Sequence, residues 1–135
     1  MSLIAWNESL SVGVREIDEQ HRKLIQLING LHDHMVAGDA REIMGKVLER
    51  VIQYTAFHFE TEEKLMQLHA FGGGAAHVRE HKALVAKALD LQKKFTQGQT
   101  AITMETMTFL RDWLQHHILE SDKMLGKFLS VQGVR

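Results

Sequence analysis

Apolar residues recur at every third or fourth position in four long stretches of the chain, and this spacing predicts four amphipathic α-helices. The stretches run over residues 18–37, 39–68, 75–98 and from 103 to about 117. A short terminal segment with Leu125 and Leu129 follows and predicts one more helix. No stretch alternates strictly between apolar and polar residues, so the pattern favours an all-α fold without strands.

The connections between these helices are short, and short connections favour antiparallel neighbours. We therefore expect an up-down-up-down antiparallel four-helix bundle with a short C-terminal helix. Residues 1–17 are aperiodic and are interpreted as an N-terminal arm laid across the bundle. Asp18 is a candidate N-cap of the first helix, and Gly38 is a candidate stop. Residues 1–135 are expected to form a single domain, with the bundle and C-terminal helix over 18–131.

Composition changes this picture in only one respect. The chain has 16 Lys and Arg against 17 Asp and Glu, and this balance gives no reason to expect nucleic acid as a partner. No apolar run approaches the roughly 20 residues of a membrane span, and the first residues lack a secretory signal, so we expect a cytoplasmic protein. Cysteine is absent, which excludes thiolate ligands, but there are nine histidines.

Six polar residues fall on the apolar stripes of the predicted helices, where a core side chain is expected. They are His21, His58, Glu62, His77, His81 and His117. Burying unpartnered polar groups costs on the order of 1–3 kcal/mol each, so six of them need a common explanation. In an antiparallel bundle all six lie at the same end, within a slab of roughly 10–12 Å. The sequence thus predicts one internal site.

Imidazole and carboxylate groups without sulfur suit iron, zinc, copper or manganese. Five histidines and a carboxylate are too many for one ion and fit two. Asp122 follows His117 by five residues, a step that places both on one face only if the helix is locally widened or broken. A π-type turn is therefore predicted between them, and Asp122 becomes the second carboxylate.

These residues and their spacing resemble the signature of the hemerythrin family. The resemblance rests on His21, His58-x-x-x-Glu62, His77-x-x-x-His81 and His117-x-x-x-x-Asp122, within about residues 12–128. It implies a non-haem di-iron centre with an oxo or hydroxo bridge, which binds O2 reversibly. It also implies that Glu62 and Asp122 bridge two irons. His77, His81 and His117 would complete one iron, and His21 and His58 the other. His117 is preferred over His116 by the five-residue step and by the helical stripe.

The function expected from this resemblance is O2 binding for transport, storage or sensing, without enzymatic activity and with an unidentified protein partner allowed. One alternative is a di-iron oxidase, a peroxidase or a nitric-oxide-handling enzyme, and another is iron storage or iron sensing. A site with five imidazoles and two carboxylates has less negative charge to support high-valent iron, which favours reversible binding.

Several residues outside the predicted ligand set carry expectations of their own. His32, His34 and His69 are interpreted as surface or loop residues. Glu60, Glu63 and Glu120 are expected to be solvated, with Glu63 facing about 100° away from Glu62. Phe59 and Trp113 are expected to pack near the site.

Overall fold

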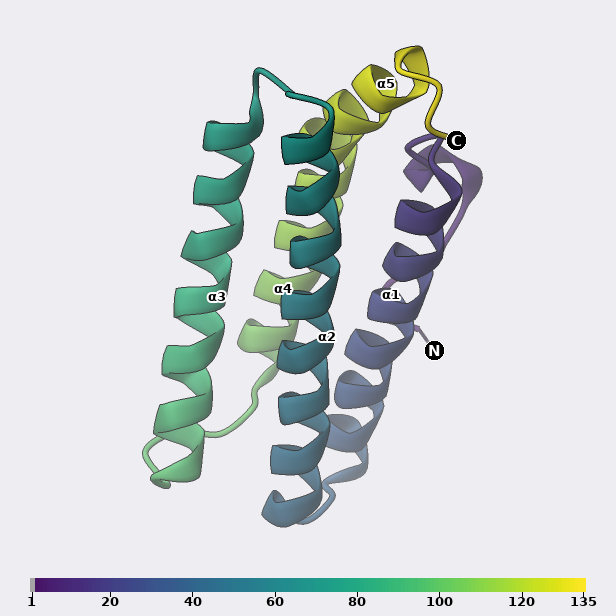
Figure 1. The fold of residues 1–135 in the computed structure, drawn as a ribbon. Helices are drawn as coiled ribbons and strands as arrows, with labels where there is room; N and C mark the ends of the chain where they lie inside the picture. The colour runs from purple at the N-terminus through teal and green to yellow at the C-terminus, as the bar shows by residue number, and fades with distance from the viewer. Residues whose placement is uncertain (1) are drawn as a thin grey trace.

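The computed structural model describes residues 2–135, and four long helices run alternately up and down along a common axis (Figure 1). These helices are α1 (Arg15–Ala37), α2 (Arg41–Leu68), α3 (Gly74–Thr96) and α4 (Met104–His117). A π-helical turn, Ile118–Asp122, joins α4 to α5 (Lys123–Val131), which lies across one end of the bundle. No strand occurs within residues 2–135. The predicted all-α bundle with a short C-terminal helix is confirmed.

The first helix begins earlier than the sequence pattern indicates. It starts at Arg15, so the prediction that Asp18 caps its N-terminus is wrong. The Asp18 carboxylate lies inside the helix and accepts hydrogen bonds from the Ser11 hydroxyl and from the Val12 backbone N–H at 2.8 Å. The Asp18 carboxylate therefore holds the N-terminal arm against α1 and does not cap the helix. Gly38 ends α1 as predicted, with a left-handed φ of 70°.

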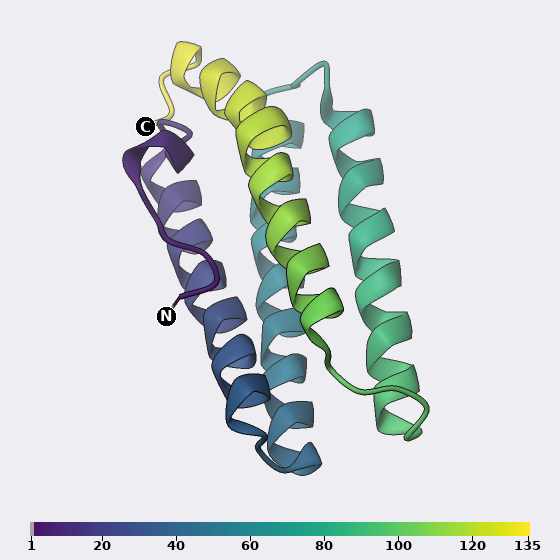
Figure 2. The same ribbon diagram turned by 180° about the vertical axis from the view of Figure 1, so that it is seen from behind.

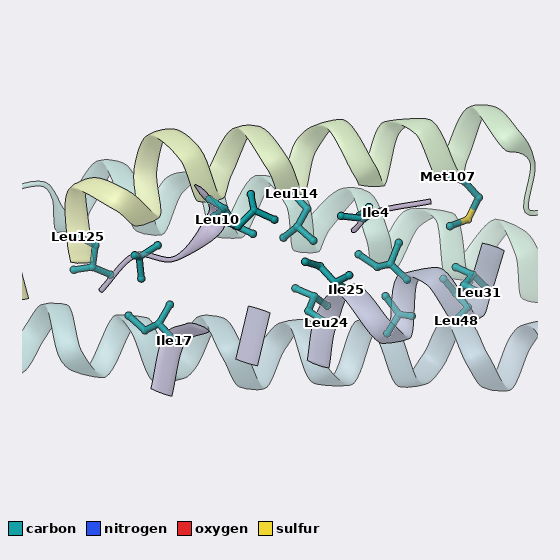
Figure 3. Packing of buried hydrophobic residues seen from close by; sticks show 14 of the residues in the cluster. Ile4, Leu10, Ile17, Leu24, Ile25, Leu31, Leu48, Met107, Leu114 and Leu125 are labelled. Atoms are coloured by element: carbon teal, nitrogen blue, oxygen red, sulfur yellow. The ribbon is translucent and has the colours of Figure 1, made fainter. Parts of the chain in front are cut away.

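Buried apolar side chains fill the space between the helices, as Figure 3 shows for residues such as Leu24, Leu31 and Leu125. The spacing within residues 39–68 predicts an apolar stripe through Ile43, Val47, Val51 and Tyr54, but near the start of α2 the buried face is rotated by one residue. Ile43 is 45% exposed, whereas Met44 and Leu48 are buried. Most buried positions of α2 follow one another at intervals of three or four residues, which keeps them on one face toward the other helices.

The N-terminal arm folds back along α1 (Figure 2). The Asn29 side chain holds it, because its oxygen accepts the Ile4 N–H and its amide donates to the Ile4 carbonyl, each at 2.9 Å. The Arg22 guanidinium lies 4.5 Å from the centre of the Trp6 ring, a cation–π contact at the same interface. No helix within residues 2–135 has both the length and the apolar character needed to cross a bilayer.

Replacing Gly126 by alanine is expected to destabilise the protein by about 1–3 kcal/mol, the usual range for overpacking. A Cβ atom on Gly126 would lie only 2.0 Å from the Val12 carbonyl oxygen, so the arm would have to leave α5. Gly30→Ala is the matched control. It also lies in a helix, but a Cβ there meets no atom within 4 Å, and we expect it to stabilise the fold slightly. Urea unfolding measures both, and equal effects would contradict the predicted clash.

Candidate metal centre

The seven residues predicted from the sequence converge at the end of the bundle where α5 crosses. His21 comes from the start of α1, His58 and Glu62 from the end of α2, His77 and His81 from the start of α3, His117 from the end of α4 and Asp122 from the π-helical turn. None of these residues is more than 3% exposed. The bundle topology therefore brings together side chains that lie up to about a hundred positions apart in the chain.

These side chains form two groups that share both carboxylates. The three-histidine group contains Glu62, His77, His81, His117 and Asp122. The two-histidine group contains His21, His58, Glu62 and Asp122. In each group the candidate ligand atoms all lie within 4.8 Å of one another, which is close enough for them to hold a metal ion together.

Glu62 presents a different oxygen to each group. Its Oε1 atom lies 3.2 Å from Nε2 of His77 and 3.0 Å from Nε2 of His81. Its Oε2 atom lies 3.2 Å from Nε2 of His58 and 3.7 Å from Nε2 of His21. A carboxylate placed in this way can bind two cations, one through each oxygen.

Asp122, at the end of the π-helical turn, repeats this arrangement. Its Oδ1 atom lies 2.9 Å from Nε2 of His77 and 3.1 Å from Nε2 of His117, and its Oδ2 atom lies 2.9 Å from Nε2 of His21. The π-helical turn over Ile118–Asp122 makes this possible, because its wider winding restores Asp122 to the face of His117. The predicted helix widening is confirmed.

Several buried atoms at the centre have no hydrogen-bond partner. They include Nε2 of His21 and His58, Oε2 of Glu62 and both carboxylate oxygens of Asp122. The distances between them are short, but the bond directions do not suit hydrogen bonds between the side chains. These atoms belong to the two groups of candidate ligand atoms, an arrangement that a shared metal ion in each group would satisfy. Because orphaned buried polar atoms are costly, the donor set fits a pair of metal ions.

The buried imidazoles and carboxylates at the centre shift one another's pKa values. Burial opposes a positive charge on His21, but Asp122 and Glu62 outweigh burial and raise the pKa of His21 to about 9. The same carboxylates raise the pKa of His77 to about 10 against its burial. Burial would raise the pKa of both carboxyl groups, but the surrounding imidazoles lower it below the usual range. Both carboxylates are therefore ionised and available as ligands at neutral pH.

Three polar side chains support the histidines from outside the centre. Each is adjacent in sequence to one proposed ligand but contacts a histidine on the next helix along the chain. Gln20 on α1 contacts His58, Glu63 on α2 contacts His81, and Glu80 on α3 contacts His117. The expectation that Glu63 is solvated holds only in part, since its side chain is 36% exposed but also contacts His81, and the sequence analysis missed all three contacts. Their adjacency to a ligand is the one signal that the sequence offers.

Aromatic rings cover the three-histidine group. Phe59 stacks on the ring of His81, with the centroids 3.7 Å apart and the planes 4° from parallel. Trp113 stacks on the ring of His117 at 4.5 Å and 15°. Both residues pack near the site, as predicted. These contacts fix the orientation of two imidazoles and keep the centre away from bulk water.

A partly open, mainly apolar chamber of about 480 Å³ lies between the four helices on the side away from α5. Four of its wall residues each lie three positions from a histidine of the centre, which is about one helical turn. These wall residues are Leu24, Thr55, Leu84 and Leu114. The chamber thus places low-polarity space one turn from the cluster.

Comparisons with known proteins agree with this geometry. Residues 12–129 match the family described as the hemerythrin HHE cation binding domain. A bacteriohemerythrin of Methylococcus capsulatus is 40% identical over 131 residues, covering 96% of this chain and 99% of that protein. One of Stenotrophomonas maltophilia is 34% identical, covering 91% of this chain and 79% of that protein. A crystal structure of wild-type hemerythrin superposes with a TM-score of 0.91 at 38% identity, covering 96% of this chain and 99% of that chain. The chain belongs to the hemerythrin family.

Proposed function

We propose that this protein binds O2 reversibly at a pair of iron ions held by the seven buried side chains. The observation that carries the proposal is the placement of Glu62 and Asp122, each with one oxygen toward either histidine group. Imidazole and carboxylate are suitable ligands for iron, and the family of this chain supports the choice of metal. When bound, two ferrous ions can each lend one electron to O2 and take it back on release.

The two groups differ in the number of ligands that they offer. His77, His81 and His117 would hold one ion and His21 and His58 the other, and Glu62 and Asp122 would each offer one oxygen to either group. The two-histidine group therefore supplies one protein ligand fewer. An ion held by His21 and His58 would therefore be the one with room for O2.

The surroundings of the centre suit binding without further reaction. O2 is apolar, and the chamber beside the cluster offers it low-polarity space. Ile25, Phe59 and Leu114 are each no more than 3% exposed and form apolar packing at this level of the bundle. Excluding bulk water limits proton access, which protects a bound state from side reactions.

A di-iron oxidase, peroxidase or nitric-oxide-handling enzyme is the second candidate function. Within residues 2–135 only Glu62 and Asp122 bring carboxylates into the two groups, and the remaining ligands are imidazoles. This composition provides little negative charge for high-valent iron. We therefore propose a binding protein rather than an enzyme, with transport, storage and sensing all served by the same chemistry.

Metal analysis followed by oxygen cycling tests the proposed function. Protein from iron-replete cells is expected to contain about two irons per chain, from the number of ligands present. After reduction, the diferrous spectrum should disappear on adding O2 and return when O2 is removed. The zinc-loaded protein is the control, since it should take up no O2. Accumulation of peroxide in each cycle would instead support the oxidase function.

Azide is expected to bind the oxidised protein at the ion held by His21 and His58. Azide is a small anionic ligand, and the two-histidine group is the one that leaves a coordination position free in this assignment. A crystal structure of the azide complex measures its position directly. Azide found on the ion of the three-histidine group would contradict the assignment of the open position.

A further inference from the structure

Carboxylates contact the outer ring nitrogen, Nδ1, of two histidines in the three-histidine group. The Nδ1 atom of His81 lies 2.9 Å from Oε2 of Glu63, and Nδ1 of His117 lies 3.1 Å from Oε1 of Glu80. The Ser121 hydroxyl contacts both oxygens of Glu80, at 2.7 and 2.8 Å, and so fixes that carboxylate. Because a carboxylate only accepts hydrogen bonds, Nδ1 carries the proton in both imidazoles. Their Nε2 lone pairs are then free to face the metal.

In the two-histidine group, the outer ring nitrogens contact an amide or have no partner. Nδ1 of His58 donates to the Gln20 amide oxygen at 2.7 Å. The amide nitrogen of Gln20 lies 3.3 Å from the Thr61 hydroxyl, which itself donates to the Phe57 carbonyl, so the amide orientation is determined. Nδ1 of His21 is buried without a hydrogen-bond partner. Within residues 2–135, therefore, no carboxylate contacts the outer nitrogen of either histidine in this group.

We propose that Glu63 and Glu80 are positioning residues that make the two iron ions unequal. A carboxylate that accepts the outer N–H of a ligating imidazole increases the basicity of that ligand and adds negative charge near the ion. Both effects stabilise ferric over ferrous iron. The ion of the three-histidine group is therefore oxidised first, and the ion with the open position is the last to lose its electron.

This asymmetry deepens the proposed function and rests on it, because it requires two iron ions. O2 must meet a ferrous ion where the coordination position is open. Because O2 binding draws one electron from each ion, unequal potentials determine which ion supplies its electron more readily, and a pair that has already lost one electron no longer binds O2 in this way. The outer carboxylates are accessible to mutation without disturbing the core, since the side chains of Glu63 and Glu80 are 36% and 43% exposed.

The test replaces each carboxylate by its isosteric amide. Glu63→Gln and Glu80→Gln retain the size of the side chain but remove its charge. Each is expected to weaken the preference for ferric iron at the three-histidine ion by about tenfold, which is 59 mV for a one-electron couple. Glu60→Gln is the matched control, because Glu60 lies on the same helix as Glu63, is 65% exposed and contacts Lys64 rather than a histidine. Redox titration followed by Mössbauer spectroscopy reports the oxidation state of each ion.

The reverse change provides a second variant. Gln20→Glu places a carboxylate behind His58 and is expected to lower the potential of the two-histidine ion, which reduces the difference between the ions. Iron content separates the two hypotheses, since fewer than two irons in the unaltered protein contradicts the proposed function itself. Two bound irons whose potentials are unchanged in Glu63→Gln, Glu80→Gln and Gln20→Glu would overturn the inference and leave the proposed function standing.

Discussion

Replacing His117 by alanine is expected to reduce the iron content and to lower the melting temperature of iron-loaded protein by roughly 10–20 °C. The Nε2 atom of His117 lies 3.1 Å from Asp122 and 3.2 Å from Nε2 of His81, so its removal takes one donor from the centre of the three-histidine group. A metal that binds only the folded state adds on the order of 4 kcal/mol when its concentration is 1,000 times its dissociation constant. Losing this stabilisation by the metal accounts for the expected fall in melting temperature.

His116→Ala is the matched control for this experiment. His116 is the adjacent residue on α4 but is exposed, and it belongs to neither histidine group. Iron added to metal-free protein should raise the melting temperature of the unaltered chain and of His116→Ala equally. It should have little effect on His117→Ala. This comparison separates metal loss from the cavity that alanine leaves beside Trp113. Equal stabilisation of both variants by iron would show that His117 is not a ligand.

The helices and the cluster were predictable because both depend on regular spacing within single helices. A histidine on an apolar stripe is easy to recognise in a sequence. Antiparallel packing then places the start of one helix beside the end of the next, so these histidines lie at one level of the bundle. The π-helical turn followed from the same reasoning, since a five-residue step between His117 and Asp122 does not fit regular winding. The start of α1 was misjudged because Asp18 accepts hydrogen bonds from the arm, a contact to a segment without periodicity.

The outer partners of the histidines were not predictable from helical spacing. Glu63 was placed outside the site because it faces about 100° away from Glu62 on the same helix. That direction leads to α3, where Nδ1 of His81 lies 2.9 Å from its carboxylate. Spacing describes one helix at a time, whereas this contact depends on the rotation and height of α2 relative to α3. Side-chain packing across the whole bundle determines those quantities.

In metal-free protein, raising the pH from 6.5 to about 10 is expected to lower the free energy of unfolding by several kcal/mol. His21 and His77 have folded-state pKa values of about 9 and about 10, above the ordinary value of 6.5. The folded protein therefore binds more protons than the unfolded chain in this window, and its stability falls as the pH rises. His21 alone contributes on the order of 3 kcal/mol, fully present below pH 6.5.

On the acid side, stability falls below about pH 4, because the pKa values of Glu62 and Asp122 are lowered in the folded protein.

Iron is expected to reverse this dependence. A metal ion competes with protons for the imidazole nitrogens, so its binding strengthens as the pH rises from 6.5 to 9 and stabilises the fold further. Denaturant unfolding of chelated and iron-loaded protein across this range measures both trends. His77→Gln in the metal-free protein should show a weaker decline, because one of the titrating groups is gone. Metal-free protein that gains stability between pH 6.5 and 9 would contradict the charge arrangement at the centre, since the buried carboxylates would then not be holding protons on His21 and His77.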